Sequence, residues 1–312
     1  MATASMAGGV MGAFLFSLLH PLPVLAAGLA LGAKPALIAA IASAGFVFLA
    51  LPTSGLLFAA SYAAPIWLTV RLVLTSRSGV AWSRGSGDAP VDERDWYPVG
   101  GVLAVMTVVA GAFLVAGSLF TGGGLEDAVK AAMTELGDAL VDMDSATPEQ
   151  RQAQELLRMK FMGFVPYFAG LAAGMWTLVL LVNAVLAQRL VAGKGANIRP
   201  TPRYKDLTLP DWLSWALVAS ALAALIGPGE MGYIGRSLTI AFAVPFFLLG
   251  LAVAHSAAAR TAYASGLLTA LYVLAVLSGW FILVIAGIGI VEQWVGLRNR
   301  MRPIAPQEDE QS

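Results

Sequence analysis

The stretch "VGGVLAVMTVVAGAFLVAGSLFT", residues 99–121, contains no charged side chain. An apolar helix of about 20 residues is long enough to cross the hydrocarbon core of a bilayer, which is about 30 Å thick. Residues 169–187 form a second charge-free stretch of similar length. Both stretches therefore predict helices that span a membrane.

The composition of the whole chain agrees with this interpretation. Of its 312 residues, 58% are hydrophobic and 12% are charged, whereas a soluble domain carries about 25% charged residues. The formal net charge is zero, so we expect no binding to nucleic acid. The absence of cysteine excludes disulfides and cysteine-based metal sites. The first cationic residue is Lys34, so we expect the first apolar segment to remain in the protein rather than to be cleaved.

We predict an all-α protein, a polytopic helical transmembrane bundle in which residues 1–312 form a single integral membrane domain. Hydropathy along the chain indicates about eight membrane segments. Their approximate bounds are 8–32, 34–51, 54–75, 98–121, 161–188, 211–227, 236–255 and 266–292. The acidic residues 303–312 are predicted to form a disordered tail.

A polar insert over residues 122–160 separates the fourth and fifth predicted segments. Its apolar residues recur at spacings of three and four, which is typical of one helix face; they are Leu125, Val129, Met133, Leu136, Leu140 and Met143. A second helix is predicted to start at "TPEQ", with Thr147 as N-cap and Pro148 in the first turn. We expect an amphipathic helical hairpin outside the bilayer core, which either caps the bundle or acts as a lid over a binding site.

The charges leave the orientation of the bundle open. With eight segments, alternate loops divide the 19 Lys and Arg residues into a set of eleven and a set of eight. Cationic loops tend to stay in the cytoplasm, which favours the larger set as cytoplasmic. The ending "LRNRMRP" also looks cytoplasmic but belongs to the smaller set. The two observations agree if a late segment fails to cross or if 266–292 folds back.

The first predicted segment contains the interruption "HPLP", residues 20–23. Proline removes a backbone donor and clashes with the preceding turn, so Pro21 and Pro23 predict a structural break. Unpaired backbone is tolerated in a bilayer only where protein or a water-filled cavity covers it, and broken helices are typical of transporter binding sites. Two interpretations stay open: the helix ends at Leu19 at the interface and a re-entrant segment follows, or His20 faces a ligand.

A few other residues in the segments carry predictions. Asn183 either hydrogen-bonds across helices or lines a polar cavity. Together with His20 and Trp176 it makes up the candidate ligand-binding set. Two pairs fit the Gly-x-x-x-Gly pattern and are predicted to mark close helix packing; they are Gly28 with Gly32 and Gly170 with Gly174.

Charged and titratable residues near the segment ends receive structural interpretations. His255 is interpreted as an interfacial or packing residue. Glu292 is interpreted as ending its segment in the headgroups, with an ion pair to Arg298 as the alternative. Glu230 and Arg236 are predicted to lie in a short loop within "GPGEMGYIGRS".

Sequence signatures of catalysis are missing. The chain contains no phosphate-binding loop, no His-Glu-x-x-His and no Gly-x-Ser-x-Gly. Its two histidines are far apart and there is no cysteine, so a zinc site is not expected. We predict that the protein is not an enzyme and that it has no metal or cofactor.

Four motifs in order along the chain resemble a bacterial family of predicted multi-pass membrane proteins, the domain of unknown function 2232. They are "PLPVLAAGLALGAKPALIAA" (21–40), "NIRPTPRYKDLTLPDWLSWAL" (197–217), "FFLLGLAVAHSAAAR" (246–260) and "GIGIVEQWVGLRNRMRP" (287–303). The resemblance implies a bacterial inner-membrane protein remotely akin to the substrate-capturing subunits of energy-coupling-factor transporters. It implies a helical bundle that binds a small molecule and works with other transport subunits and an ATPase. The sequence departs from that pattern in the insert over 122–160 and in its number of segments.

Two hypotheses for function follow. In the first, the protein is a transport-related membrane protein that binds a small molecule through His20, Asn183 and Trp176. In the second, it is a non-transporting membrane scaffold or envelope-assembly factor, whose amphipathic insert docks a partner or lies on the membrane surface.

Overall fold

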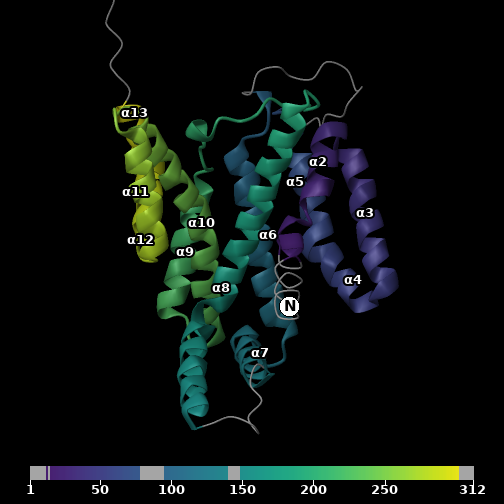
Figure 1. The fold of residues 1–312 in the computed structure, drawn as a ribbon, viewed down its shortest axis with the longest axis vertical. Helices are drawn as coiled ribbons and strands as arrows, with labels where there is room; N and C mark the ends of the chain where they lie inside the picture. The colour runs from purple at the N-terminus through teal and green to yellow at the C-terminus, as the bar shows by residue number, and fades with distance from the viewer. Residues whose placement is uncertain (1–11, 13–14, 78–94, 140–147, 302–312) are drawn as a thin grey trace, which may run out of the picture.

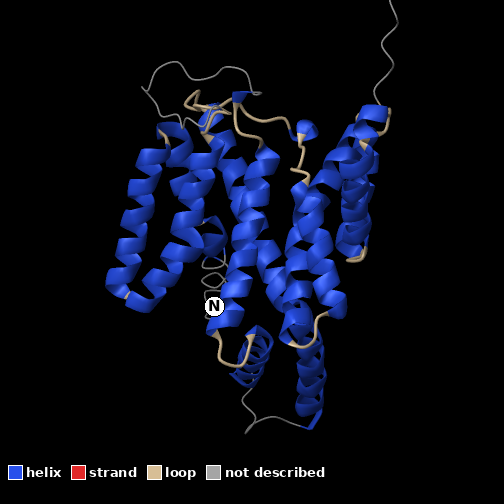
Figure 2. Ribbon diagram, turned by 180° about the vertical axis from the view of Figure 1, so that it is seen from behind, coloured by secondary structure: helices blue, strands red, loops and turns tan. Residues whose placement is uncertain are grey.

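The computed structural model describes residues 12, 15–77, 95–139 and 148–301. This part of the chain is built of helices, with an isolated β-bridge between Ser76 and Trp96 and no β-strand (Figure 1, Figure 2). The predicted all-α bundle is therefore confirmed. The predicted tail over 303–312 lies outside the described residues.

The helices follow the hydropathy segments closely at the start of the chain. Residues 15–19 form a short helix. The labelled helices up to the insert are α2 (Leu22–Leu31), α3 (Ala33–Ala50), α4 (Pro52–Phe58), the π-helix η1 (Ala59–Ala63), α5 (Ala64–Val73) and α6 (Val99–Phe120). Those that follow are α7 (Leu125–Ala139), α8 (Pro148–Gly193), the 3₁₀-helix η3 (Tyr204–Asp206), α9 (Trp212–Ile226), α10 (Glu230–Ala258), α11 (Ala264–Leu277), α12 (Phe281–Val295) and α13 (Leu297–Arg300).

Five helices are long and apolar enough to cross a membrane. They are Ala33–Ala50, Pro52–Val73, Val99–Phe120, Arg158–Gly193 and Glu230–Ala258. Four shorter apolar helices accompany them, namely Leu15–Leu31, Trp212–Ile226, Ala264–Leu277 and Phe281–Val295.

Helix α10 lies at the centre of one half of the bundle and packs against α6, α8, α9 and α12. Glycines allow the closest of these contacts. A Cβ atom on Gly250 would lie 1.9 Å from the carbonyl oxygen of Ile285, and one on Gly289 would lie 1.8 Å from that of Phe246. The backbones of α10 and α12 therefore touch, which a side chain at either glycine would prevent.

The second helix of the insert is not separate from the membrane segment that follows it. Its second helix starts at Pro148, but it continues without interruption into the fifth predicted segment as the 46-residue helix α8. Such a helix is about 69 Å long, more than twice the thickness of a hydrocarbon core. Figure 1 shows the first part of α8 projecting beyond the other helices, with α7 beside it.

The prediction of one segment over 266–292 is wrong. The chain turns at Ser278–Trp280, so that α11 and α12 form a hairpin whose two open ends lie at the same end of the bundle (Figure 1). Each helix is about 21–22 Å long, shorter than a hydrocarbon core. This is the folded-back arrangement that reconciles the basic ending with the other cationic loops.

We call the end of the bundle that carries residues 74–77, 95–98, 194–211, 259–263 and 296–301 the upper end, as it is oriented in Figure 1. The opposite end, which carries residues 121–124 and 227–229, is the lower end. The prediction that Glu230 and Arg236 lie in a loop is wrong, because α10 begins at Glu230 and includes Arg236. Gly227, Pro228 and Gly229 suffice for the turn between α9 and α10.

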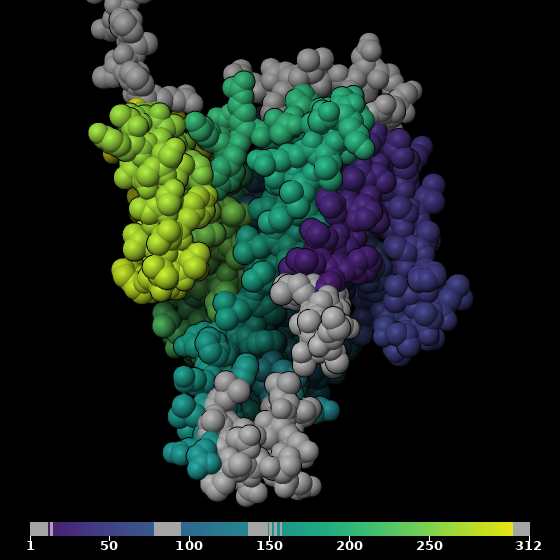
Figure 3. All heavy atoms as spheres, viewed as in Figure 1, coloured from purple at the N-terminus to yellow at the C-terminus, as the bar shows by residue number. Residues whose placement is uncertain are grey.

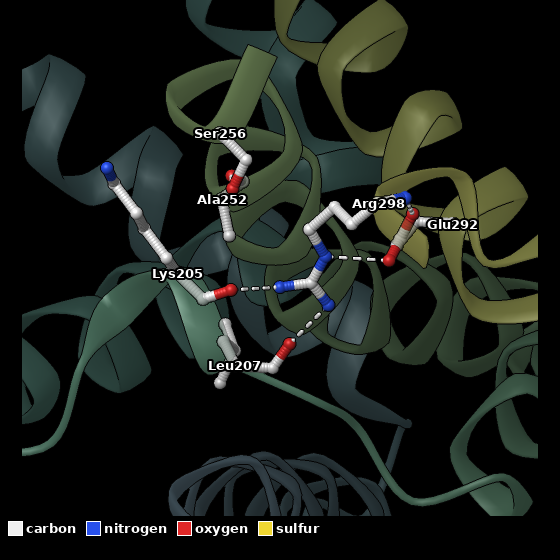
Figure 4. Close-up of polar contacts among 6 residues, drawn as sticks. All are labelled: Lys205, Leu207, Ala252, Ser256, Glu292 and Arg298. Carbon is white, nitrogen blue, oxygen red and sulfur yellow. Dashed lines mark hydrogen bonds and ion pairs between the residues drawn. The ribbon is translucent and has the colours of Figure 1, made fainter. Parts of the chain in front are cut away.

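Two arginines hold the connection 194–211 across the upper end. Arg199 is 1% exposed and donates to the carbonyl oxygens of Val73 and Tyr97, at 3.1 and 3.0 Å. Arg298 donates to the carbonyl oxygens of Lys205 and Leu207, as Figure 4 shows. The connection is thus bonded to the C-terminal end of α5 and the segment before α6 on one side, and to α13 on the other.

The carboxylate of Glu292 orients the second of these arginines. Glu292 is 7% exposed, and its oxygens accept from Nε of Arg298 at 2.6 Å and from the backbone amide of Arg298 at 3.0 Å (Figure 4). The structure therefore shows the ion pair that the sequence analysis kept as the alternative for Glu292. A charge-assisted pair of this geometry fixes the guanidinium toward the connection.

Candidate functional site at the interrupted first helix

The first helix is interrupted where the two prolines lie. Residues 15–19 are helical, His20 and Pro21 form a turn, and α2 starts at Leu22. In Figure 3 this part of the chain lies on the molecular surface between α8 and α3. Pro21 has no amide hydrogen, so the carbonyl of Ser17, four residues earlier, loses its usual helical donor.

Side chains supply the donors that this interruption requires. Nδ1 of His20 lies 2.7 Å from the carbonyl oxygen of Ser17. Because a carbonyl only accepts, Nδ1 carries a proton, and in the neutral tautomer of this kind Nε2 is an acceptor. Nδ2 of Asn183, on α8, donates to the carbonyl oxygen of Leu18 at 2.8 Å and to that of Val179 at 2.8 Å. The break is therefore covered by its own histidine and by α8.

A second irregular turn faces the first one. The π-helix η1 precedes Pro65, whose missing amide hydrogen would have served the carbonyl of Ser61. Nε1 of Trp176, on α8, donates to that carbonyl oxygen at 2.9 Å. Tyr62, in the same π-helix, meets the His20 ring edge to face, with ring centroids 4.3 Å apart. Single-turn π-helices occur frequently at functional sites.

The three residues of the predicted ligand-binding set thus share one physical role. Each donates a hydrogen bond to a backbone carbonyl at or beside a proline-induced irregularity. His20 and Asn183 meet the same interrupted helix, whereas Trp176 lies two turns from Asn183 along α8 and serves the π-helix. The spacing of proline and carbonyl, four residues, was the signal in the sequence that could have identified Ser17 and Ser61.

Two acceptor atoms at the interruption have no hydrogen-bond partner among the described residues. They are Nε2 of His20 and Oδ1 of Asn183, both buried. The Asn183 side chain as a whole is 1% exposed. A buried polar atom without a hydrogen bond costs about 1–3 kcal/mol, and both atoms require an N–H or O–H donor from elsewhere.

Three of the four predicted packing glycines lie at close contacts between helices, and the fourth lies in a turn. A Cβ atom on Gly28 would lie 2.7 Å from Cγ2 of Val70, and one on Gly170 would lie 2.8 Å from Cα of Ser237. One on Gly174 would lie 3.1 Å from Cγ2 of Val244. Gly32 instead forms the turn between α2 and α3 with φ of 114°, a conformation that favours glycine.

His255 lies in a separate cluster near the upper end. Its Nδ1 bonds the carbonyl oxygen of Leu251 at 2.8 Å, and its Nε2 lies 3.3 Å from the hydroxyl of Tyr272. Both ring nitrogens are therefore engaged, as expected for a packing residue. Among the described residues, no group of three or more His, Cys, Asp or Glu could hold a metal ion.

Comparison with known proteins gives a match to a family. A family model described as "Predicted membrane protein (DUF2232)" matches residues 5–292, which is nearly the whole chain. No curated protein and no solved structure matches it.

Proposed function

The chain belongs to the DUF2232 family of predicted membrane proteins, and from this premise we propose that it is a multi-pass protein of the bacterial inner membrane that binds a small molecule in support of transport. The observation that carries the proposal is the pair of buried acceptors at the interrupted first helix, Nε2 of His20 and Oδ1 of Asn183. Interrupted helices with unwound backbone place ligand-binding groups at membrane depth in many transporters.

The chemistry of the two acceptors selects the ligand. With the imidazole in the tautomer that donates from Nδ1, both atoms accept hydrogen bonds, so the ligand presents hydroxyl, amide or amine hydrogens and no anionic group. Tyr62 and Phe58 stand beside the His20 ring, with ring centroids 4.3 and 6.0 Å away, and give the ligand an aromatic wall. Sites of this type are mostly apolar, with a few convergent polar groups.

Such a protein acts with partners. The sequence has no phosphate-binding loop, so transport driven by ATP requires an ATPase and other membrane subunits. We propose that this chain captures the ligand and performs no chemistry on it.

We further propose that the upper end faces the cytoplasm. Eleven of the described cationic residues lie on segments at that end, namely Lys34, Arg71, Arg77, Arg189, Lys194, Arg199, Arg203, Lys205, Arg260, Arg298 and Arg300. Five lie toward the lower end, namely Lys130, Arg151, Arg158, Lys160 and Arg236. The excess of Lys and Arg on cytoplasmic segments supports this orientation, which puts α7 on the outer side.

The scaffold hypothesis is supported less well. Its docking surface would be the apolar stripe of α7, but Leu125, Val129 and Met133 are half-buried. Helix α7 packs against α8, α6 and α10. The first half of the stripe therefore faces the bundle of the same chain, as in a cap, whereas Leu136 is 47% exposed.

The test is purification of the full chain from its own membranes in mild detergent, followed by native mass spectrometry and identification of co-purifying proteins. We expect a bound small molecule that His20→Phe loses and the control His255→Phe retains. We also expect membrane subunits with an ATPase. Recovery of neither ligand nor subunits, across several growth conditions, would overturn the proposal.

A further inference from the structure

A single arginine lies inside the long apolar helix α10. Arg236 follows the first residue of the helix, Glu230, by six positions, and no Asp, Glu, Lys or Arg occurs between it and the end of the helix at Ala258. It lies toward the lower end of the bundle, which has fewer cationic residues, so the preference for Lys and Arg on cytoplasmic segments does not explain its presence. Ionisable residues within spans are rare and mark binding or transport paths by default.

Arg236 has no counter-ion within the part of the chain that the structure describes. Its Nε is buried without a hydrogen-bond partner, and the one ion pair seen between described residues joins Arg298 to Glu292. The acid on its own helix, Glu230, accepts instead from the hydroxyl of Ser118 at 2.5 Å and from the amides of Leu125 and Glu126 at 2.7 and 3.3 Å. A partly buried cation is thus without a direct ion pair among the described residues.

Two hydroxyls beside Arg236 are also unpaired. Tyr233 and Ser237 are both 0% exposed, and neither Oη of Tyr233 nor Oγ of Ser237 has a hydrogen-bond partner among the described residues. Arg236 and Ser237 follow Tyr233 by three and four residues, so each is a neighbour of Tyr233 on the helix surface. The backbone of α8 at Gly170 lies directly against Ser237. Ser237 is therefore packed against α8, and Arg236 and Tyr233 adjoin it along the same part of α10.

The three groups have one chemistry in common. The guanidinium carries five N–H donors in a planar fork and matches carboxylate and phosphate oxygens in pairs. The phenol and the serine hydroxyl can each donate one more hydrogen bond. The cluster thus offers positive charge and donors together, in contrast to the two neutral acceptors at the interrupted first helix.

We propose that Arg236, Tyr233 and Ser237 form a second binding site, which takes an oxyanion group, carboxylate or phosphate. The oxyanion supplies the missing counter-charge and accepts from the two hydroxyls. Its source is either a soluble anion or the phosphate of a lipid headgroup, since both present the same oxygens. The proposal does not depend on the site at His20 and Asn183.

The experiment uses the full chain, purified in neutral detergent or reconstituted in nanodiscs. Inorganic phosphate and acetate are titrated at constant ionic strength while Tm is followed, and nanodiscs with and without phosphatidylglycerol are compared by native mass spectrometry. The variants are Arg236→Gln and the control Arg158→Gln, which removes an exposed cation on the lower part of α8.

We expect at least one probe to bind the wild-type protein and Arg158→Gln, with binding to Arg236→Gln weaker by about tenfold or more. Binding of phosphate or acetate identifies a soluble anion, and retention of phosphatidylglycerol alone identifies a lipid. The double variant Tyr233→Phe with Ser237→Ala should leave the free protein as stable as before, because the hydroxyls it removes are unpaired, and should still weaken binding. If the wild-type protein binds none of the probes, or Arg236→Gln binds them equally well, the proposal fails.

Discussion

Nδ2 of Asn183 lies 2.8 Å from the carbonyl oxygen of Leu18, a residue 165 positions earlier in the chain. The bond joins α8 to the first helix at the point where that helix is interrupted. In a membrane, no water is present to take over such a bond, so the donor must come from the protein. Asn183 therefore stabilises the interruption that the prolines cause.

We expect Asn183→Leu to destabilise the protein by about 2 kcal/mol, because the carbonyl of Leu18 is left without this donor inside the bundle. The measurement is Tm in detergent. Val182→Leu is the matched control, since residue 182 is 52% exposed on the same turn of α8 and makes no such bond. A Tm for Asn183→Leu equal to that of the control would show that the bond is not needed.

A double-mutant cycle tests the link between Pro65 and Trp176. Trp176→Phe removes the donor to the carbonyl of Ser61 but keeps an aromatic ring, and should destabilise by about 1 kcal/mol. Pro65→Ala restores the backbone amide that can serve the same carbonyl. In that background we expect Trp176→Phe to have less than half of its original effect. Equal effects in both backgrounds would mean that the tryptophan acts through packing alone.

Local sequence signals predicted most of the apolar helices. Pro21 and Pro23 mark the break in the first helix, because proline acts on its own turn whatever surrounds it. The sequence did not identify the side chains that donate hydrogen bonds to the carbonyls beside the prolines. Asn183 and Trp176 were selected as polar groups in a span, but nothing in the sequence pairs them with Leu18 and Ser61, more than a hundred residues away.

The fold errors have a common physical cause. Hydropathy measures how apolar a segment is, and residues 266–292 are apolar whether the chain crosses the membrane or turns back at Ser278–Trp280. Arg236 was placed in a loop because glycines and charges surround it, yet only Gly227, Pro228 and Gly229 form the turn. Packing of α9 against α10 sustains the helix from Glu230 onward.

The arginine at the upper end gives a third prediction. Arg298→Met leaves the carboxylate of Glu292 buried without its cation and frees the carbonyls of Lys205 and Leu207. Removing one partner of a buried pair costs about 3–5 kcal/mol. We expect faster hydrogen exchange over residues 204–211 and a lower Tm, with part of the Tm recovered in Arg298→Met with Glu292→Gln. Unchanged exchange over 204–211 would show that the connection is held without the pair.

The orientation of the bundle can be tested without first removing any residue, because the natural chain contains no cysteine. Lys194→Cys places a thiol at the upper end and Lys130→Cys places one on α7 at the lower end, both at exposed positions. In intact cells whose outer membrane has been made permeable, a membrane-impermeant maleimide should label the thiol at residue 130 and leave residue 194 unlabelled until the inner membrane is opened. The opposite pattern would put α7 in the cytoplasm, and the charge excess at the upper end would then need another explanation. Labelling of neither thiol before lysis would instead indicate that the upper and lower ends lie on one side, which a spanning bundle does not allow.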